Sequence, residues 1–122
     1  MKLRIQGNSI RFRVGPSEVQ RLASAGRVEE TVHFAPGLSL TYAIEISATA
    51  ASVCVAGSPK EVAVIVPAPL AQAWAGGSGI GIYGTVPNGS GSLEFALEKD
   101  FACLDPHHAA NHDTYPNPKT AC

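Results

Sequence analysis

The stretch KLRIQGNSIRFRV, residues 2–14, carries the strongest structural signal in the chain. Apolar and polar side chains alternate on both sides of a Gly-Asn pair, which is the pattern of two half-buried strands. A two-residue turn with glycine at its first central position joins such strands closely. Leu3 then lies opposite Phe12, and Ile5 lies opposite Ile10, both on a buried face. We therefore expect an antiparallel hairpin whose other face is basic.

The remaining sequence alternates strand patterns with two short helical patterns. A helix is expected over residues 15–26, because Pro16 suits its first position and Gly26 suits its end. A second is expected over residues 67–77, which begin with prolines and end in two glycines. Strand patterns cover residues 27–34, 38–47, 52–57, 61–66, 78–86 and 92–101.

These elements predict an α+β single domain over residues 1–122. About eight mostly antiparallel strands would form a curved sheet or half-barrel, with two short helices on one side. The β-rich core would span residues 1–101, and residues 102–122 would form an extended C-terminal strap. No internal repeat is evident in the sequence.

The composition is that of an ordinary globular protein, with 45% hydrophobic and 16% charged residues. No apolar run approaches the ~18 residues that a membrane span requires. The N-terminal residues lack the apolar core of a signal peptide, so, taking residue 1 as the native start, we expect a cytoplasmic protein with no membrane partner. The odd count of three cysteines argues against a disulfide framework.

The outward face of the first hairpin gathers four positive charges. They are Lys2, Arg4, Arg11 and Arg13. Like charges directly opposite one another destabilise a hairpin, so something should compensate them. A small anion or an acidic protein partner could do so, and so could a neighbouring strand with acidic outward residues. The candidates for that strand's charges are Glu94, Glu98 and Asp100.

Charge also divides unevenly along the chain, which carries +5 through Arg27 and −6 thereafter. The net charge is therefore only −1, and no aromatic residue interleaves the four basic ones. Nucleic acid is for these reasons not an expected partner.

The last twenty residues, CLDPHHAANHDTYPNPKTAC, concentrate side chains that bind metals. Asp105-Pro106 is a typical helix opening, and His108 and His112 would share one face of that helix. Two histidines with one or two thiolates fit tetrahedral zinc, while copper and nickel also accept such donors. The predicted metal ligands are Cys103, His108, His112, Asp113 and Cys122, with His107 as a nearby spare.

Two other arrangements of this tail stay open. It could pack on the sheet as a strap through Tyr115 and its prolines, with the histidines in solvent. Alternatively, Cys103 and Cys122 could form a disulfide that contributes about 3 kcal/mol by closing the loop. A cytoplasmic location opposes the disulfide.

Enzymatic motifs are weak. Gly79, Gly81 and Gly84 have the spacing of a dinucleotide fingerprint, but a helix precedes them and a strand follows, the reverse of the required order. Cys54 lies between valines like a buried small hydrophobic residue, and His33 has no evident partner. We therefore expect no catalytic residues.

Several segments resemble those of a known protein family. They are the opening KLRIQGNSIRFRV, the segments SEVQRLASAGRVEE and EKDFACL, and the tail YPNP before a final cysteine. They are similar to a family of short, uncharacterised bacterial proteins, a domain of unknown function. The resemblance spans nearly the whole chain and implies a small single-domain cytoplasmic protein without a known reaction.

The same resemblance bears on the tail. Relatives carry mostly acidic residues where this chain has HHAANH, so His107 and His108 are poor candidates for a shared function. The elements that the resemblance implies to be common are Cys103, Asp113, residues 115–118 and Cys122.

The predicted function is accordingly that of a small, cytoplasmic, non-enzymatic protein that binds or handles a transition metal, zinc above all, through its tail. The alternative is an interaction module that binds a protein or a small anion through the basic hairpin.

Overall fold

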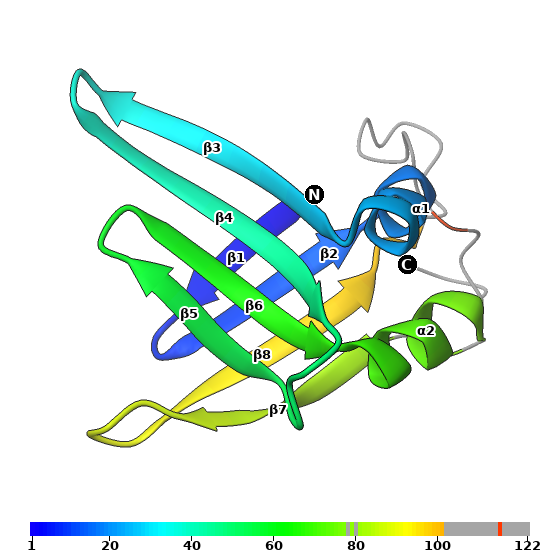
Figure 1. Ribbon diagram of the computed structural model, residues 1–122. Coiled ribbons are helices and arrows are strands. Elements are labelled where there is room, and N and C mark those ends of the chain that lie inside the picture. The colour runs from blue at the N-terminus through cyan, green and yellow to red at the C-terminus, as the bar shows by residue number, and fades with distance from the viewer. Residues whose placement is uncertain (78, 80, 102–114, 116–122) are drawn as a thin grey trace.

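The computed structural model describes residues 1–77, 79, 81–101 and 115 of the chain (Figure 1). Within these residues, eight strands and two helices follow one another. The strands are β1 (Lys2–Gln6), β2 (Ser9–Val14), β3 (Arg27–Ala35), β4 (Leu38–Ser47), β5 (Cys54–Ser58), β6 (Glu61–Pro67), β7 (Gly81–Pro87) and β8 (Ser92–Lys99). The helices are α1 (Pro16–Ala25) and α2 (Ala68–Gly76).

The strands form two four-stranded sheets that pack face to face. Sheet A has the order β1-β2-β8-β7, and sheet B has the order β3-β4-β6-β5. In each sheet two antiparallel hairpins meet through a parallel pair of central strands, β2 with β8 and β4 with β6. The predicted α+β class is confirmed, but the strands form two sheets that do not close into a barrel.

The two halves of the chain repeat one topology. Each half is a hairpin, a helix and a second hairpin, and the elements of the second half begin 52 to 54 residues after their counterparts in the first. Each sheet takes one hairpin from each half. The sequence shows no such repeat because the topology depends only on element order, which different side chains can encode.

The first hairpin has the predicted register, with Leu3 opposite Phe12 and Arg4 opposite Arg11. Phe12 is fully buried, and its ring centroid lies 6.4 Å from that of Tyr42 in sheet B. The expectation for Ile5 was wrong, since this side chain is 61% exposed. It lies on an edge strand beside the turn, at the end of the molecule opposite the helices (Figure 1).

Both helices close the same end of the two sheets (Figure 1). α1 buries Val19 and Leu22, and α2 buries Ala71 and Trp74, all within one core with the inner faces of the sheets. Gly26 ends α1 in the left-handed conformation at φ +80°, as its position predicted. A single hydrophobic core therefore joins both sheets and both helices.

Strand β5 is less buried than its apolar sequence suggested. Cys54 and Val55 are half-buried, and residues 56–58 are exposed, because β5 is an edge strand of sheet B. Gly57 has φ +151°, and a Cβ atom there would lie 2.1 Å from the Glu61 carbonyl oxygen. Only glycine lets β5 approach β6 this closely at that turn.

Candidate functional site

The predicted metal ligands lie outside the described part of the chain. They are Cys103, His108, His112, Asp113 and Cys122, and the spare His107 lies there too. Among the residues that the structure does describe, no group of three or more His, Cys, Asp or Glu side chains is arranged to hold a metal ion. The metal site therefore stays a prediction.

Three rows of side chains cross the outer face of sheet A, because the registers of its strand pairs align. One row consists of Lys2, Arg13, Glu98 and Gly81. The next consists of Arg4, Arg11, Ala96 and Tyr83. The third consists of Gln6, Ser9, Glu94 and Thr85. The four predicted basic residues, here called the basic face, thus occupy β1 and β2, and β8 brings acidic residues beside them.

Two carboxylates from the end of sheet A partly neutralise the basic face. Lys2 Nζ lies 2.8 Å from an Asp100 carboxylate oxygen. Glu98 Oε1 lies 3.4 Å from Arg11 Nε and 3.6 Å from Arg13 Nε. The compensating acidic strand considered from sequence is therefore present, and it reaches the basic face by parallel pairing of β8 with β2.

The compensation is incomplete. Arg4 lies within 3.4 Å of the Gln6 side-chain oxygen but has no carboxylate partner among the described residues. Glu94 forms no ion pair within the same residues, although it lies on the same face. Three of the four cations thus share two carboxylates and Arg4 contacts neither, which leaves an excess of positive charge centred on β1.

A hollow of about 170 Å³ opens at this excess charge. Its lining consists of Lys2, Leu3, Arg4, Arg11 and Arg13. The side chains of Lys2, Arg11 and Arg13 are 52%, 39% and 46% exposed, so they can reorient toward a ligand. Exposed ion pairs contribute at most about 1 kcal/mol each, so the existing pairs would not prevent an anion from binding. Guanidinium groups suit phosphate and carboxylate oxygens.

Glu98 also fixes an aromatic residue that the sequence gave no reason to single out. The Tyr83 hydroxyl donates a hydrogen bond of 2.7 Å to Glu98 Oε2. Gly81 leaves room for this contact, because a Cβ atom there would lie 2.8 Å from the Tyr83 hydroxyl oxygen. Alternation along 81–87 places Tyr83 on the outer face, but only the pairing of β7 with β8 shows that it lies near Glu98.

The environment of Tyr83 raises its pKa above the ordinary value of 10.0. Partial desolvation is the larger cause, and the hydrogen bond to the Glu98 carboxylate is the second. The nearby cations Arg11 and Arg13 oppose the rise without cancelling it. Tyr83 therefore stays neutral, as a hydrogen-bond donor to Glu98, at physiological pH.

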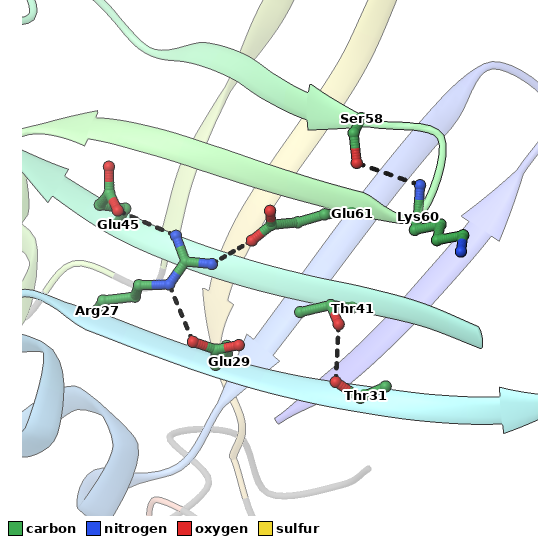
Figure 2. A network of polar contacts seen from close by, with 8 residues as sticks. All are labelled: Arg27, Glu29, Thr31, Thr41, Glu45, Ser58, Lys60 and Glu61. Carbon is green, nitrogen blue, oxygen red and sulfur yellow. Dashed lines mark hydrogen bonds and ion pairs between the residues drawn. The ribbon is translucent and has the colours of Figure 1, made fainter.

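The outer face of sheet B has the opposite charge. Arg27 on β3 contacts a glutamate from each of three strands (Figure 2). Its Nη1 lies 3.0 Å from Glu45, its Nε lies 3.3 Å from Glu29, and its Nη2 contacts Glu61. These contacts raise the Arg27 pKa, the hydrogen bond to Glu45 being the largest cause. Sequence analysis missed this network because its members come from β3, β4 and β6.

The C-terminal end of sheet A is tied to a residue far along the chain. Phe101 and Tyr115 form a parallel β-bridge, and their rings lie 5.7 Å apart. The Tyr115 backbone N–H donates a 2.7 Å hydrogen bond to the Asp100 carbonyl oxygen. Buried Lys99 donates to the Gly77 carbonyl oxygen at 2.9 Å, with its ammonium group 5.5 Å from the Tyr115 ring centre. Phe101 and Tyr115, which flank residues 102–114 in the sequence, therefore lie side by side.

Two of the weak catalytic candidates lie on sheet B, away from the basic face. His33 is exposed on β3, and Cys54 is a half-buried free cysteine at the start of β5. Gly81 and Gly84 lie in β7, after α2 rather than before a helix, as the order of elements predicted. A Cβ atom at Gly84 would lie 3.0 Å from the Phe95 ring, so this glycine serves close packing.

No helix within the described residues is long and apolar enough to cross a membrane.

Fold and surface together define a small α+β domain, built of two mixed sheets, with a basic patch on one outer face. The chain belongs to a family of unknown function, DUF7009, whose profile matches residues 1–119. This match agrees with the resemblance drawn from the sequence segments. No curated protein and no solved structure matches the chain.

Proposed function

We propose that this protein is a non-enzymatic interaction module that binds an anionic group through the basic face of sheet A. The ligand class is a phosphate or carboxylate, borne either by a small molecule or by an acidic protein partner. The observation that carries the proposal is the hollow lined by Lys2, Arg4, Arg11 and Arg13, where cations outnumber carboxylates.

The charge balance favours a ligand over a purely structural role. A charge ladder alone would satisfy every cation, whereas Arg4 lies directly opposite Arg11 without a carboxylate of its own. Two arginines facing each other repel one another, and an anion between them would relieve this repulsion. Charge-assisted hydrogen bonds from guanidinium groups are about twice as strong as neutral ones.

Thermal unfolding with added inorganic phosphate tests this proposal. We expect millimolar phosphate at low ionic strength to raise the melting temperature of the wild type but not of the Arg4→Ala/Arg11→Ala double variant. The control is Arg21→Ala, which removes an exposed arginine from α1 and should respond like the wild type. Equal shifts in the wild type and the double variant would reject the basic face as the site.

A second candidate function is the binding of a transition metal, zinc above all, through Cys103, His108, His112, Asp113 and Cys122. The attachment of Tyr115 beside Phe101 favours it. Four of these five residues lie between Phe101 and Tyr115 in the sequence, and these two residues pair with each other. Closing a loop in advance lowers the entropic cost of gathering ligands from its two ends.

Elemental analysis of the natively purified, untagged protein, with thiols counted in parallel, tests the metal proposal. We expect near-stoichiometric zinc that is lost in Cys103→Ser and retained in Cys54→Ser, the matched variant at the free cysteine of β5. Chelation should also lower the melting temperature. A metal-free protein whose stability does not change on addition of Zn²⁺ would refute the proposal.

We further propose a cytoplasmic location in a bacterial cell, on the basis of the N-terminal sequence and the family resemblance. Cell fractionation followed by detection with an antibody would test the location, and recovery in the membrane pellet would refute it.

A further inference from the structure

A second hollow, of about 400 Å³, adjoins the basic face on the other side of Arg11. It lies over β8 on the outer face of sheet A, and its lining includes Ser9, Arg11, Tyr83, Thr85, Glu94 and Ala96. Ala96 is the smallest side chain at the centre of the three rows, so it forms the floor. Because Arg11 lines both hollows, they are neighbouring parts of one surface.

Two planar groups are among the side chains that line this second hollow. Arg11 and Tyr83 flank Ala96 in a single row, on strands β2 and β7 respectively. These strands lie two strand spacings apart, which is about 9.5 Å. Both side chains lean toward Glu98 in the neighbouring row, so the space over Ala96 stays open to a planar ring that stacks on the Tyr83 phenol. Both groups stack favourably on aromatic rings.

Glu98 orients the Tyr83 ring before any ligand arrives, and it lies close to Arg11 without a hydrogen bond at its Oε1. Its Oε1 lies 3.4 Å from Arg11 Nε, and its Oε2 accepts the hydrogen bond from the Tyr83 hydroxyl. The Glu98 side chain is only 18% exposed, so it is itself held by the surrounding sheet. Tyr83, by contrast, is 59% exposed, which leaves its ring accessible to a ligand.

The open side of the hollow offers hydrogen-bond acceptors. Glu94 and Thr85 face each other there across β8 and β7, and the Glu94 carboxylate forms no ion pair within the described residues. A carboxylate in this position accepts hydrogen bonds from hydroxyl or amino groups. It also disfavours a second anionic group over β8.

We infer that the ligand of the basic face is a nucleoside phosphate or an equally planar aryl phosphate. Its phosphate lies in the hollow over Arg4 and Arg11, its ring lies over Ala96 against the Tyr83 phenol, and its hydroxyl or amino groups point to Glu94. The inference rests on the proposed anion-binding function and specifies the ligand class. The two hollows are about one and a half strand spacings apart, roughly 7 Å, which a sugar can bridge.

Isothermal titration calorimetry with three probes tests the inference: adenosine 5′-monophosphate, ribose 5-phosphate and inorganic phosphate. We expect the nucleotide to bind at least tenfold more tightly than ribose 5-phosphate, the factor that base stacking on an aromatic side chain contributes. Tyr83→Ala should abolish this difference and leave the affinity for inorganic phosphate unchanged. Ala96→Val, which fills the floor, should have the same effect.

Phe34→Ala is the matched control, because Phe34 is an equally exposed aromatic residue, 61% against 59%, on a strand of sheet B. It should keep the tenfold preference. If the nucleotide and ribose 5-phosphate bind equally and both are lost in Arg4→Ala/Arg11→Ala, the inference fails while the anion-binding function stands. If none of the three probes binds at millimolar concentration, both fail.

Discussion

On the outer face of sheet A, side chains from two neighbouring strands converge on Glu98. Its carboxylate meets Arg11 and Arg13 on β2 and the hydroxyl of Tyr83 on β7, and these are the two strands that flank β8. Glu98 therefore has both a structural role, since it compensates charge, and a positioning role for the proposed ligand. The effect of a Glu98 substitution on the pKa of Tyr83 tests the positioning role separately from the charge compensation.

The titration of Tyr83 tests its hydrogen bond to Glu98. The pKa of Tyr83 is higher in the folded protein than in the unfolded chain, where it is about 10.0. The neutral phenol therefore stabilises the fold below pH 10, and this contribution is lost as the pH rises through the folded-state pKa. Glu98→Gln removes the negative charge that disfavours the phenolate, so we expect the Tyr83 pKa to fall. The tyrosinate absorbance difference between each protein and its Tyr83→Phe derivative measures it.

Tyr42 provides the internal control for this titration. Its pKa is also raised, by desolvation and by its hydrogen bond to Glu30 in sheet B, so Glu98→Gln should leave it unchanged. A Tyr83 pKa that does not respond to Glu98→Gln would show that the hydrogen bond is absent in solution.

Ion pairs between strands join elements that are distant in the sequence. In sheet A the pairing of β2 with β8 brings Arg13 opposite Glu98. In sheet B, Arg27 joins β3, β4 and β6 through three glutamates. These networks explain how the basic N-terminal part and the acidic remainder of the chain compensate each other, which the sequence left as one of two possibilities.

Glu98→Ala should destabilise the protein by about 1–2 kcal/mol in the absence of any ligand. The reason is that two arginines and a tyrosine hydroxyl then lose a common, largely buried partner. Urea denaturation measures the change in the free energy of unfolding. Glu94→Ala, on the same face of the same strand, is the control and should stay within ±0.5 kcal/mol. Equal effects of both substitutions would argue against a specific network.

Arg27→Ala should destabilise the fold by about 1–2 kcal/mol at low salt, because it leaves three glutamates of neighbouring strands without their shared cation. The loss should shrink at about 1 M salt, where the Debye length is near 3 Å. Urea denaturation of Arg27→Ala and of the α1 variant Arg21→Ala, at both salt concentrations, measures the effect. A loss that does not depend on salt would indicate packing by the arginine stem rather than charge.

The whole molecule consists of two hairpin–helix–hairpin halves, and each sheet contains one hairpin from each half. Sheet A combines β1–β2 with β7–β8, and sheet B combines β3–β4 with β5–β6. Neither half contains a complete sheet, and isolated two-stranded hairpins are marginally stable at best. We therefore expect the domain to unfold as one cooperative unit despite its repeated topology.

Fragments test this organisation. We expect peptides of residues 1–50 and 51–122, cut between β4 and β5, to be unfolded alone and to regain β structure when mixed in equal amounts. Circular dichroism of each fragment and of the mixture measures this. Cooperative unfolding of either fragment by itself would contradict the exchange of hairpins.

The sequence by itself determined the local elements. Alternation specified the register of the first hairpin, and Pro16 and Gly26 specified the limits of α1, because these signals act between residues close in the chain. The basic face also followed from alternation alone. The metal ligands predicted in residues 103–122 stay a prediction, since those residues lie outside the described part of the chain.

Only the tertiary structure decided which strands pair across the molecule. The parallel contacts of β2 with β8 and β4 with β6 depend on packing around one core, and no local pattern encodes them. Together with the pairing of β7 with β8, they place Ala96 between Arg11 and Tyr83, leave Ile5 and β5 at the edges, and gather three glutamates around Arg27. Side-chain types follow from the sequence, but the neighbours that give them a function are set by contacts between residues far apart in the chain.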